Sequence, residues 1–549
     1  MERCSFDCMG RSSRYFLLIA LTAIAAWLRF SAIGFGLPEQ YRPDEEMTVP
    51  TALGFEHDFN PHLAIYPAAQ TYLIHGVLRS YAALSGAGSN WRMMYRAEGD
   101  ARAFRIARKI AAAMGTATVP AVYLAAASSF GPQAAIAAAG IVAVAFIHVR
   151  DSKFAKVEVP AGFWLALSLA MMLLLAKRGR LIDYGLAGLF CGLAAATHYT
   201  SGSVAIGIVV AHLEARQREA KPLLTSLLDA RIYLAGAITL LAFLSADPYF
   251  VLDWAQTKAD FGFMRVIYAD WNHGHSAAGY GWTWLLLRAM PASFGIALEI
   301  FLLVAMVWVV FRPRPGTYAL LAFVAVCFLS LTRGHPQLEF RYLVNPLIAM
   351  ALLGGVMAED LIAMAQSWMP RMRYVAALAG ALLLAPSLLR DIQLNHLLRA
   401  PDTRTIAKFW ILNHIPSRDS IVLVDGYDYG KPRIAGGYNL IDAKAESATS
   451  LRDAIKSARW VIAESFPPLT QWSRDVNAEE KAELDSRGEL QLDVPSIKPD
   501  AALPVCDPND AFYVPFTHID SMIRPGPRIR IWKITRDSIP GTKLGGSPG

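Results

Sequence analysis

Residues 158–180 read EVPAGFWLALSLAMMLLLAKRGR, and this stretch decides the fold class. After Glu158 the segment is almost entirely apolar up to residue 176, and the basic group Lys177–Arg180 follows directly. A helix that crosses a membrane needs about 20 predominantly apolar residues, and cytoplasmic loops beside such helices are rich in Lys and Arg. The stretch therefore predicts a transmembrane helix whose Glu158 end lies outside and whose basic end lies in the cytoplasm.

The same composition extends through most of the chain. Of the 549 residues, 54% are hydrophobic and only 18% are charged, against about 25% charged in a typical soluble domain. The first 400 residues carry 58 charged side chains, whereas residues 401–549 carry 39 in 149 positions. This contrast excludes a wholly soluble enzyme, a disordered chain and a disulfide scaffold. The net charge of +7 is modest, so no nucleic-acid partner is expected.

Eleven segments are predicted to cross the membrane, with the N-terminus inside. The first follows three arginines but has no small-residue cleavage site after it, so we expect it to be retained rather than removed as a signal peptide. Segment 68–85 contains His75 and Arg79. Counting it would place Lys177 outside, so it is predicted to be re-entrant or interfacial. The eleven spans are 15–35, 104–128, 132–148, 158–176, 182–198, 200–215, 231–247, 290–312, 316–332, 341–358 and 374–390.

This topology predicts two domains in an inner (plasma) membrane protein. Residues 1–390 form the α-helical polytopic module with a long first external loop, 36–103, and residues 391–549 form an extracytoplasmic α/β domain. Basic residues near the outer end of the second span either snorkel or attract lipid phosphates, namely Arg92, Arg96, Arg102, Arg105, Arg108 and Lys109.

The C-terminal segment has the pattern of a small α/β domain. A helix is expected from Asp402 or Thr403 to His414, and another near 449–457. Strands are predicted at 421–424, 460–463 and 528–534. No nucleophile elbow, phosphate-binding loop or metal signature occurs there. Acceptor recognition or a structural lid is therefore the expected role.

Acidic residues gather where the predicted spans meet the outer side. Tyr41–Glu46 contains three adjacent carboxylates, whose mutual repulsion favours a general base that accepts a proton near neutral pH. A solvated acidic turn is the simpler interpretation of that triplet. Glu158 begins the fourth span, where it is either functional or a helix-cap charge. Arg341 enters the tenth span, where it either holds a phosphate with two hydrogen bonds or pairs with Glu339.

Further polar residues leave alternatives open. Asp247 precedes Pro248 and either ends a helix or joins the acids. His273 and His275 have the spacing of a metal-binding pair, which also occurs in ordinary loops. His198 is either a buried, hydrogen-bonded histidine or a functional group near a span end.

These motifs, in this order, resemble the type C multi-spanning glycosyltransferases that use polyprenyl-phosphate sugars. The similarity is greatest to the dolichyl-phosphate-mannose–protein mannosyltransferases (glycosyltransferase family 39) and their bacterial relatives. It rests on the first-loop stretch Gly36–Glu46 with Phe59–His62 and Tyr66-Pro67, on Arg150–Pro160, on Asp247–Tyr249 and on Arg341-Tyr342. It covers roughly residues 14–430.

The resemblance implies site residues. Asp44 matches the family's first-loop base that deprotonates the acceptor, and Glu45 and Glu158 are expected to join it as catalytic residues. The expected substrate-binding residues are Arg341, Tyr342, Lys153, Asp151, His198 and Tyr66. This sequence departs from the family where Glu158 replaces the usual Asp, where His198 stands at a frequent Lys, and where Lys153 stands at a frequent His.

The implied reaction moves a hexose or pentose from a polyprenyl phosphate to an acceptor hydroxyl or amine on the outer face, with inversion. Expected partners are the lipid-linked sugar, an acceptor protein, lipid or glycan, and membrane lipids. No cofactor is fixed by the sequence, and a divalent metal ion stays open. The sequence leaves two alternative functions open, a polyprenyl-lipid transporter or flippase and a non-catalytic envelope assembly protein.

Overall fold

The computed structural model describes residues 11–55, 58–274, 281–334, 339–424, 428–434, 436–443, 454, 458–469, 476–508, 510 and 512–535. The contacts divide the chain into two compact units. The first comprises Met1–Gly34 and Asp44–Asn395, and the second comprises Phe35–Pro43 and His396–Gly549.

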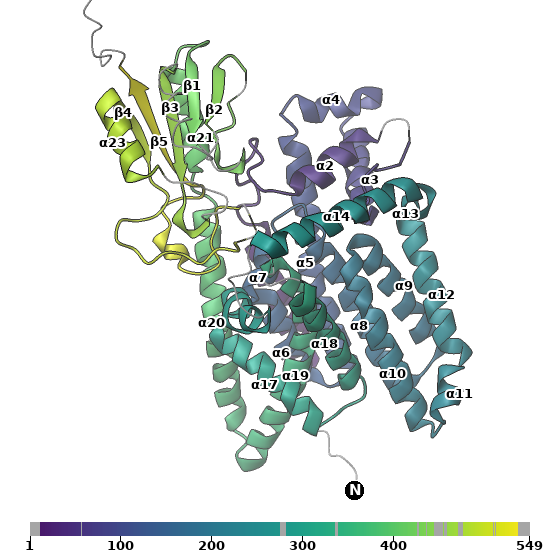
Figure 1. Ribbon diagram of the computed structural model, residues 1–549. Helices are drawn as coiled ribbons and strands as arrows, with labels where there is room; N and C mark the ends of the chain where they lie inside the picture. The colour runs from purple at the N-terminus through teal and green to yellow at the C-terminus, as the bar shows by residue number, and fades with distance from the viewer. Residues whose placement is uncertain are drawn as a thin grey trace, which may run out of the picture. The chain divides into compact units, whose positions relative to one another are not determined.

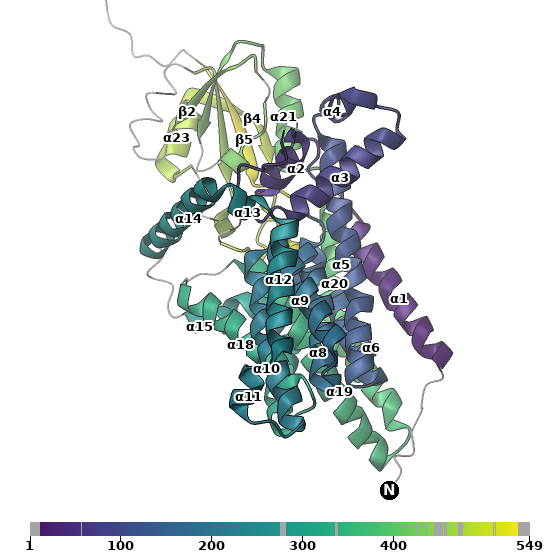
Figure 2. The ribbon, with the colours of Figure 1, turned by 90° about the vertical axis from the view of Figure 1, so that its right-hand side faces the viewer.

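The first unit is a bundle of α-helices (Figures 1 and 2). Its helices are α1 (Arg11–Phe30), α2 (Glu45–Gly54), α3 (Ala69–Leu84), α4 (Trp91–Arg96), α5 (Ala101–Ser129), α6 (Pro132–Val144), α7 (Phe146–Asp151), α8 (Glu158–Arg178), α9 (Leu181–Thr197), α10 (Val204–Arg218), α11 (Leu223–Leu227), α12 (Ala230–Ala246), α13 (Tyr249–Leu252), α14 (Trp254–Gly274), α15 (Gly281–Trp284), α16 (Met290–Phe294), α17 (Ile296–Phe311), α18 (Thr317–Gly334), α19 (Val344–Trp368) and α20 (Met372–Leu397). Four short segments join them, η1 (Gly88–Asn90), η2 (Tyr199–Ser203), η3 (Leu285–Ala289) and η4 (Phe340–Leu343).

Each of the eleven predicted spans coincides with a helix for all or most of its length. By length and composition, six helices of the described residues are long and apolar enough to cross a membrane, and seven if a bent pair counts as one span. Three more helices are apolar but shorter, at Pro132–Val144, Leu181–Thr197 and Thr317–Thr332. The multi-pass helical class is thus confirmed, whereas the count of eleven and the orientation stay predictions.

Two predicted spans are interrupted in the structure. The span 132–148 stops at Val144, because Ala145 adopts an extended conformation before α7 begins. The span 290–312 is broken at Gly295, whose positive φ of 84° separates two helices that bend by 118°. Glycine reaches this backbone region at little steric cost. Helical periodicity alone does not reveal such breaks.

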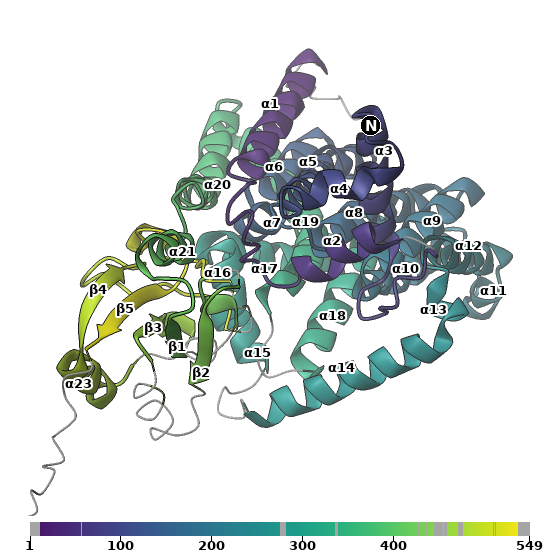
Figure 3. The ribbon, with the colours of Figure 1, turned by 90° about the horizontal axis from the view of Figure 1, so that it is seen from above.

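The long helices α8, α9, α10 and α12 pack side by side, and α8 also contacts α5 and α19 (Figure 2). The pair α9 and α12 approaches closely at Gly188, where an added Cβ would lie 2.4 Å from the Ala235 carbonyl oxygen. Small residues permit such close packing between membrane helices. Helix α14 runs across the direction of the long helices (Figures 1 and 3).

The second unit contains a five-stranded mixed sheet with the order β2-β1-β3-β5-β4. Strand β1 pairs in parallel with β2 and β3, and β5 pairs antiparallel with β3 and β4. Its elements are α21 (Thr403–His414), β1 (Ser420–Val424), η5 (Asp428–Gly430), β2 (Asn439–Ala443), β3 (Trp460–Ser465), η6 (Pro467–Leu469), α23 (Ala478–Arg487), β4 (Gly488–Val494), η7 (Ile519–Ser521) and β5 (Arg528–Ile534).

The alternation of strand side chains gives this sheet two apolar faces. Ile421 and Leu423 of β1 pack with Ile411 of α21 on one face. Val422 of β1 packs with Leu484 of α23 on the other face. Such alternation follows from the two-residue period of a strand.

The segments 421–424, 460–463 and 528–534 are strands, as the sequence predicts, and α21 begins after Asp402, whose carboxylate caps it. The helix expected near 449–457 falls largely outside the described residues. Strands β2 and β4 and helix α23 were not predicted from the sequence. Of these, α23 carries a readable signal, because Asn477 and Glu480 form a capping box at its start.

Candidate active site

Asp44 stands immediately before α2 with its backbone in the left-handed region, at φ 68° and ψ −18°. Aspartate adopts this conformation more readily than most non-glycine residues, although at some cost in free energy. The Met47 amide donates a hydrogen bond of 3.1 Å to the Asp44 carbonyl oxygen, which closes the first turn. The side chain of Asp44 remains 31% exposed and belongs to the polar cluster described next.

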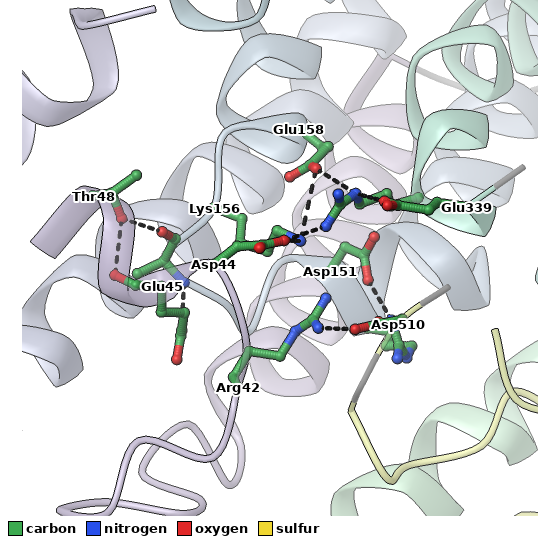
Figure 4. Close-up of polar contacts among 12 residues, drawn as sticks. Arg42, Asp44, Glu45, Thr48, Asp151, Lys156, Glu158, Glu339 and Asp510 are labelled. Atoms are coloured by element: carbon green, nitrogen blue, oxygen red, sulfur yellow. Dashed lines mark hydrogen bonds and ion pairs between the residues drawn. The ribbon is translucent and has the colours of Figure 1, made fainter. Parts of the chain in front are cut away.

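The Asp44 carboxylate meets two cations from distant parts of the chain. Its Oδ2 accepts hydrogen bonds from Lys156 Nζ at 2.8 Å and from Arg341 NH1 at 2.5 Å. Figure 4 shows Asp44, Lys156 and Glu158 turned toward one another. The repulsion expected within the acidic triplet is therefore offset at Asp44, because two cations lie within hydrogen-bond distance of its Oδ2. A solvated acidic turn would have water in their place.

Two further carboxylates share Arg341. The Arg341 Nε lies 3.2 Å from Glu158 Oε1 at the start of α8 and also pairs with Glu339, just before η4. Lys156 Nζ lies 3.9 Å from the same Glu158 oxygen. Glu158 is 4% exposed and Arg341 is 13% exposed. The result is a largely buried cluster of three carboxylates and two cations.

Glu45, the neighbour of Asp44, lies in a separate contact. Its two oxygens accept from Arg108 of α5, at 2.9 Å from Nε and 2.7 Å from NH2, and its Oε1 also accepts the Ala155 amide at 2.7 Å. Both side chains of the pair are fully buried. Thr48, one turn further along α2, donates to the Ala155 carbonyl oxygen at 2.7 Å. Glu45 therefore fixes α2 against the segment that leads to Glu158.

Tyr66 belongs electrostatically to the Asp44 cluster. Burial raises its pKa well above the usual range, and the nearby carboxylates of Asp44 and Glu158 raise it further while Arg341 opposes them. The phenol therefore stays neutral at physiological pH and can donate a hydrogen bond. The ring of Tyr342 stacks on His198 with centroids 6.2 Å apart, and Thr200 Oγ1 lies 2.8 Å from His198 Nδ1.

Two predicted binding residues are held by other partners. Lys153 Nζ donates to the Leu28 carbonyl oxygen at 2.5 Å and to that of Ser31 at 2.9 Å, both at the end of α1. Asp151 pairs with its neighbour Arg150 at 2.9 Å. The structure thus gathers Asp44, Glu158, Arg341 and Tyr66, with His198 and Tyr342 beside them, and it places Lys153 and Asp151 against other groups.

Lys156 and Arg108 were not predicted as members of these contacts. Lys156 stands two residues before Glu158, which is the only sequence signal that could have selected it over Lys153. Arg108 lay in the basic group assigned to snorkelling or lipid phosphates, and Glu339 was considered only as a partner of Arg341. That alternative is present, since the Arg341–Glu339 pair forms together with the contact to Asp44.

A divalent metal ion finds no ready site in the described part of the chain. No group of three His, Cys, Asp or Glu side chains suited to a metal ion occurs there. The carboxylates of the Asp44 cluster are already neutralised in part by Lys156 and Arg341. His273 belongs to the last turn of α14, and His275 lies outside the described residues. The metal interpretation of that pair therefore stays a prediction.

Residues 100–246 match the family model described as dolichyl-phosphate-mannose-protein mannosyltransferase. The chain is similar to this family of membrane glycosyltransferases. The resemblance inferred from the sequence is confirmed by this match, which includes Lys156, Glu158 and His198 and excludes Asp44 and Arg341. No curated protein matches the sequence.

Two solved structures match the chain at low sequence identity. The oligosaccharyltransferase of Archaeoglobus fulgidus, tethered to an acceptor peptide, is 12% identical, with a TM-score of 0.50 over 90% of this chain and 74% of that one. ArnT from Cupriavidus metallidurans, bound to undecaprenyl phosphate, is 14% identical, with a TM-score of 0.49 over 98% of this chain and 100% of that one. At these identities the first match supports the fold alone.

Proposed function

We propose that this protein transfers a sugar from a polyprenyl-phosphate donor to an acceptor hydroxyl or amine at the extracytoplasmic face of the membrane, with inversion. The observation that supports this most is the contact of one carboxylate, Asp44, with two cations, Arg341 and Lys156, beside Glu158. A base next to a phosphate-binding arginine is what such a displacement requires. The match of residues 100–246 to a family that uses dolichyl-phosphate mannose supports the donor class.

In the proposed reaction the acceptor oxygen attacks the anomeric carbon of the sugar from the face opposite the phosphate. Asp44 takes the proton of the acceptor hydroxyl as the new bond forms. The bond from the anomeric carbon to the phosphate oxygen breaks, and the lipid phosphate leaves with the electron pair. Arg341 and Lys156 meet the added negative charge on the phosphate.

A carboxylate that holds two cations is a poor proton acceptor, and the proposed donor resolves this conflict. Its phosphate competes with Asp44 for Arg341 and Lys156, because phosphate oxygens accept the same charge-assisted hydrogen bonds. When these cations turn to the phosphate, Asp44 becomes a stronger base. Donor binding therefore makes Asp44 basic enough to take the proton. When no donor is bound, the contacts with Arg341 and Lys156 disfavour proton uptake by Asp44.

The remaining residues take supporting roles in this proposal. Glu158 keeps Arg341 oriented and can accept a hydrogen bond from a sugar hydroxyl. Tyr66 supplies a neutral donor beside the carboxylates. Glu45 positions Asp44 through its ion pair with Arg108. Lys153, Asp151, His198 and Tyr342 stay as proposed substrate-binding residues.

The test uses purified protein in nanodiscs, a panel of polyprenyl-phosphate hexoses, pentoses and aminosugars, and membrane extract as the acceptor. Asp44→Asn is compared with the wild type, and Glu46→Gln serves as the matched control because it removes a neighbouring carboxylate. General-base catalysis contributes about 10²–10⁴-fold, so Asp44→Asn should lower transfer by that order while Glu46→Gln retains it. If both the wild type and Asp44→Asn bind the donor and neither transfers the sugar, the membrane extract lacks the acceptor.

The two other functions predict different results. A lipid transporter or flippase would move a labelled polyprenyl phosphate across proteoliposomes with no new glycosidic bond. A non-catalytic assembly protein would leave every donor unbound and would be unaffected by Asp44→Asn. Either result would overturn the glycosyltransferase proposal.

A further inference from the structure

The short segment η2 (Tyr199–Ser203) connects α9 to α10 within the first unit. It follows His198, whose backbone is extended at φ −153° and ψ 116°. The Ser201 amide donates to the His198 carbonyl oxygen at 2.9 Å, which closes a tight turn. A turn of this kind has about three residues per revolution. Its successive side chains therefore point in different directions, and here they contact three other segments of the same unit.

One of these contacts joins η2 to α19. The Nδ2 of Asn345 donates to Ser201 Oγ at 2.7 Å, and the two side chains are 7% and 0% exposed. Asn345 stands in the first turn of α19, four residues after Arg341. Its Oδ1 lies 3.6 Å from the position that a Cβ on Gly162 would take. Gly162 follows Glu158 on α8 by about one helical turn, so this buried hydrogen bond lies close to the Arg341–Glu158 contact.

The other two contacts of the turn also reach segments that carry predicted site residues. Tyr199 Oη donates to the Ala64 carbonyl oxygen at 3.0 Å. Ala64 stands two residues before Tyr66, so this bond ties the turn to the loop that carries the Tyr66 phenol. His198 stacks on Tyr342 with ring planes 22° apart. The turn thus joins the loop before α3 to the start of α19.

The Ser201–Asn345 bond is placed to hold the stacked rings together. His198 stands three residues before Ser201, and Tyr342 stands three residues before Asn345. Each ring therefore belongs to the same turn of chain as one partner of the bond. Because both partners are buried, loss of the bond leaves a polar atom without water to replace its partner. The two turns then shift until that atom is solvated, and they carry the rings with them.

We propose that Ser201 and Asn345 are positioning residues, which hold His198 and Tyr342 together as a surface for the sugar of the donor. This inference rests on the proposed function, in which those two rings bind substrate. Ser201 and Asn345 touch no substrate and act through the rings. The base Asp44 begins α2, which is anchored separately by a buried ion pair with α5. Loss of the bond should therefore weaken donor binding more than it slows the chemical step.

The experiment compares the wild type with Ser201→Ala, Asn345→Ala and the double variant in nanodiscs. Three properties are measured, namely the steady-state kinetics with the best donor of the panel, binding of that donor by native mass spectrometry, and deuterium uptake at residues 198–203 and 340–346. Each single change should raise KM and the donor Kd about tenfold, the scale of one lost hydrogen bond. The kcat should stay within about twofold of the wild type. Exchange at both segments should be faster, and the double variant should be no worse than either single one, because the two residues act through one bond.

Ser168→Ala is the matched control for loss of a buried hydroxyl. Ser168 Oγ donates to the Ala187 carbonyl oxygen at 3.0 Å between α8 and α9, and the side chain is fully buried. Ser168 is ten residues beyond Glu158 on the same helix, which corresponds to about 15 Å. This variant should lose a similar amount of stability while KM, donor binding and exchange at 198–203 stay near the wild-type values.

The outcomes distinguish this inference from the proposed function. A KM and Kd in Ser201→Ala no higher than in Ser168→Ala would overturn the positioning role, and so would a fall in kcat at unchanged KM. Multiplied effects in the double variant would also overturn it, because the two residues would then act independently. If the wild type binds a donor but transfers no sugar, the proposed function fails, and the binding and exchange comparisons still decide the positioning role. If the wild type binds no donor, both proposals fail.

Discussion

Arg108 and Glu45 form an ion pair with two hydrogen bonds, 2.9 Å and 2.7 Å long, in which both side chains are fully buried. The adjacent carboxylate of Asp44 instead contacts Lys156 and Arg341 and is partly exposed. Two neighbouring acids therefore occupy different environments. The buried Glu45 carboxylate suits a structural anchor, and the partly exposed Asp44 carboxylate suits a group that exchanges a proton.

This contrast predicts opposite effects of two conservative changes. Glu45→Gln leaves the Arg108 guanidinium buried without a carboxylate, which typically costs about 3–5 kcal/mol. We expect a marked fall in the thermal unfolding temperature in detergent, followed by intrinsic fluorescence. Asp44→Asn keeps the shape of a partly exposed side chain, so its unfolding temperature should stay close to that of the wild type while transfer is lost.

The measurement pairs unfolding with transfer activity for both variants. Arg102→Gln is the control for the stability arm, because its ion pair with Glu98 lies on the surface and such pairs contribute about 0–1 kcal/mol. An Asp44→Asn protein as unstable as Glu45→Gln would contradict the separation of the two roles.

The second prediction concerns Arg341, whose planar guanidinium contacts three carboxylates, those of Asp44, Glu158 and Glu339. A lysine carries the same charge but has one nitrogen and cannot hold all three in the same geometry. We expect Arg341→Lys to lower kcat/KM for the lipid donor by about 10²-fold, the scale of losing one transition-state contact. Arg312→Lys is a suitable control, since Arg312 is exposed and stacks on Trp308. Equal kinetics for Arg341→Lys and the wild type would exclude phosphate binding by Arg341.

Much of the Asp44 cluster could be predicted because hydrophobicity and loop charge assign segments to one side of the membrane. Asp44, Glu158 and Arg341 all stand where a predicted span meets the outer side, so proximity followed from topology. The exact partners did not follow. Lys153 and Lys156 are three residues apart in an irregular segment, and only the fold decides which of them reaches Asp44.

The fold was predictable in the same uneven way. Long apolar runs and the alternating strand Arg528–Ile534 carry a period that a sequence reveals. The bend at Gly295 and the break at Ala145 depend on local backbone geometry and packing. Nothing in the sequence indicated that residues 35–43 belong with the C-terminal sheet, because that association rests on the Tyr41–Arg404 and Arg42–Asp510 contacts across more than 350 residues.

Tyr66 provides a third prediction, which concerns pH. Its pKa is raised well above the usual range by burial and by the carboxylates around it. The phenol therefore stays protonated throughout the neutral and mildly alkaline range and loses no hydrogen bond there. Tyr66→Phe should lower kcat/KM but leave the shape of the pH–rate profile between pH 7 and about 9.5 unchanged, in line with the ordinary tyrosine pKa of about 10. Disappearance of an alkaline limb in Tyr66→Phe would show that this phenol ionises in the working range.

Glu464 of β3 provides the last prediction, on stability. Its carboxyl is 3% exposed, neither oxygen has a hydrogen-bond partner within the described residues, and burial raises its pKa from 4.5 to about 8. Between those two values the folded unit holds a proton that the unfolded chain releases. Unfolding therefore becomes easier as the pH rises from about 4.5 to 8, and the effect levels off above the folded-state pKa.

The expected observable is the free energy of opening of β3 amides, followed by hydrogen exchange and corrected for the intrinsic pH dependence of exchange. In the wild type it should fall between pH 5 and 8 by on the order of 1 kcal/mol or more, since one pKa unit corresponds to about 1.4 kcal/mol. Glu464→Gln carries no titratable proton, so its protection should stay level over this range and exceed that of the wild type at pH 8. Glu489→Gln, on the exposed side of β4, should retain the wild-type slope. Equal slopes in the wild type and Glu464→Gln would mean that Glu464 is ionised in the folded unit at neutral pH.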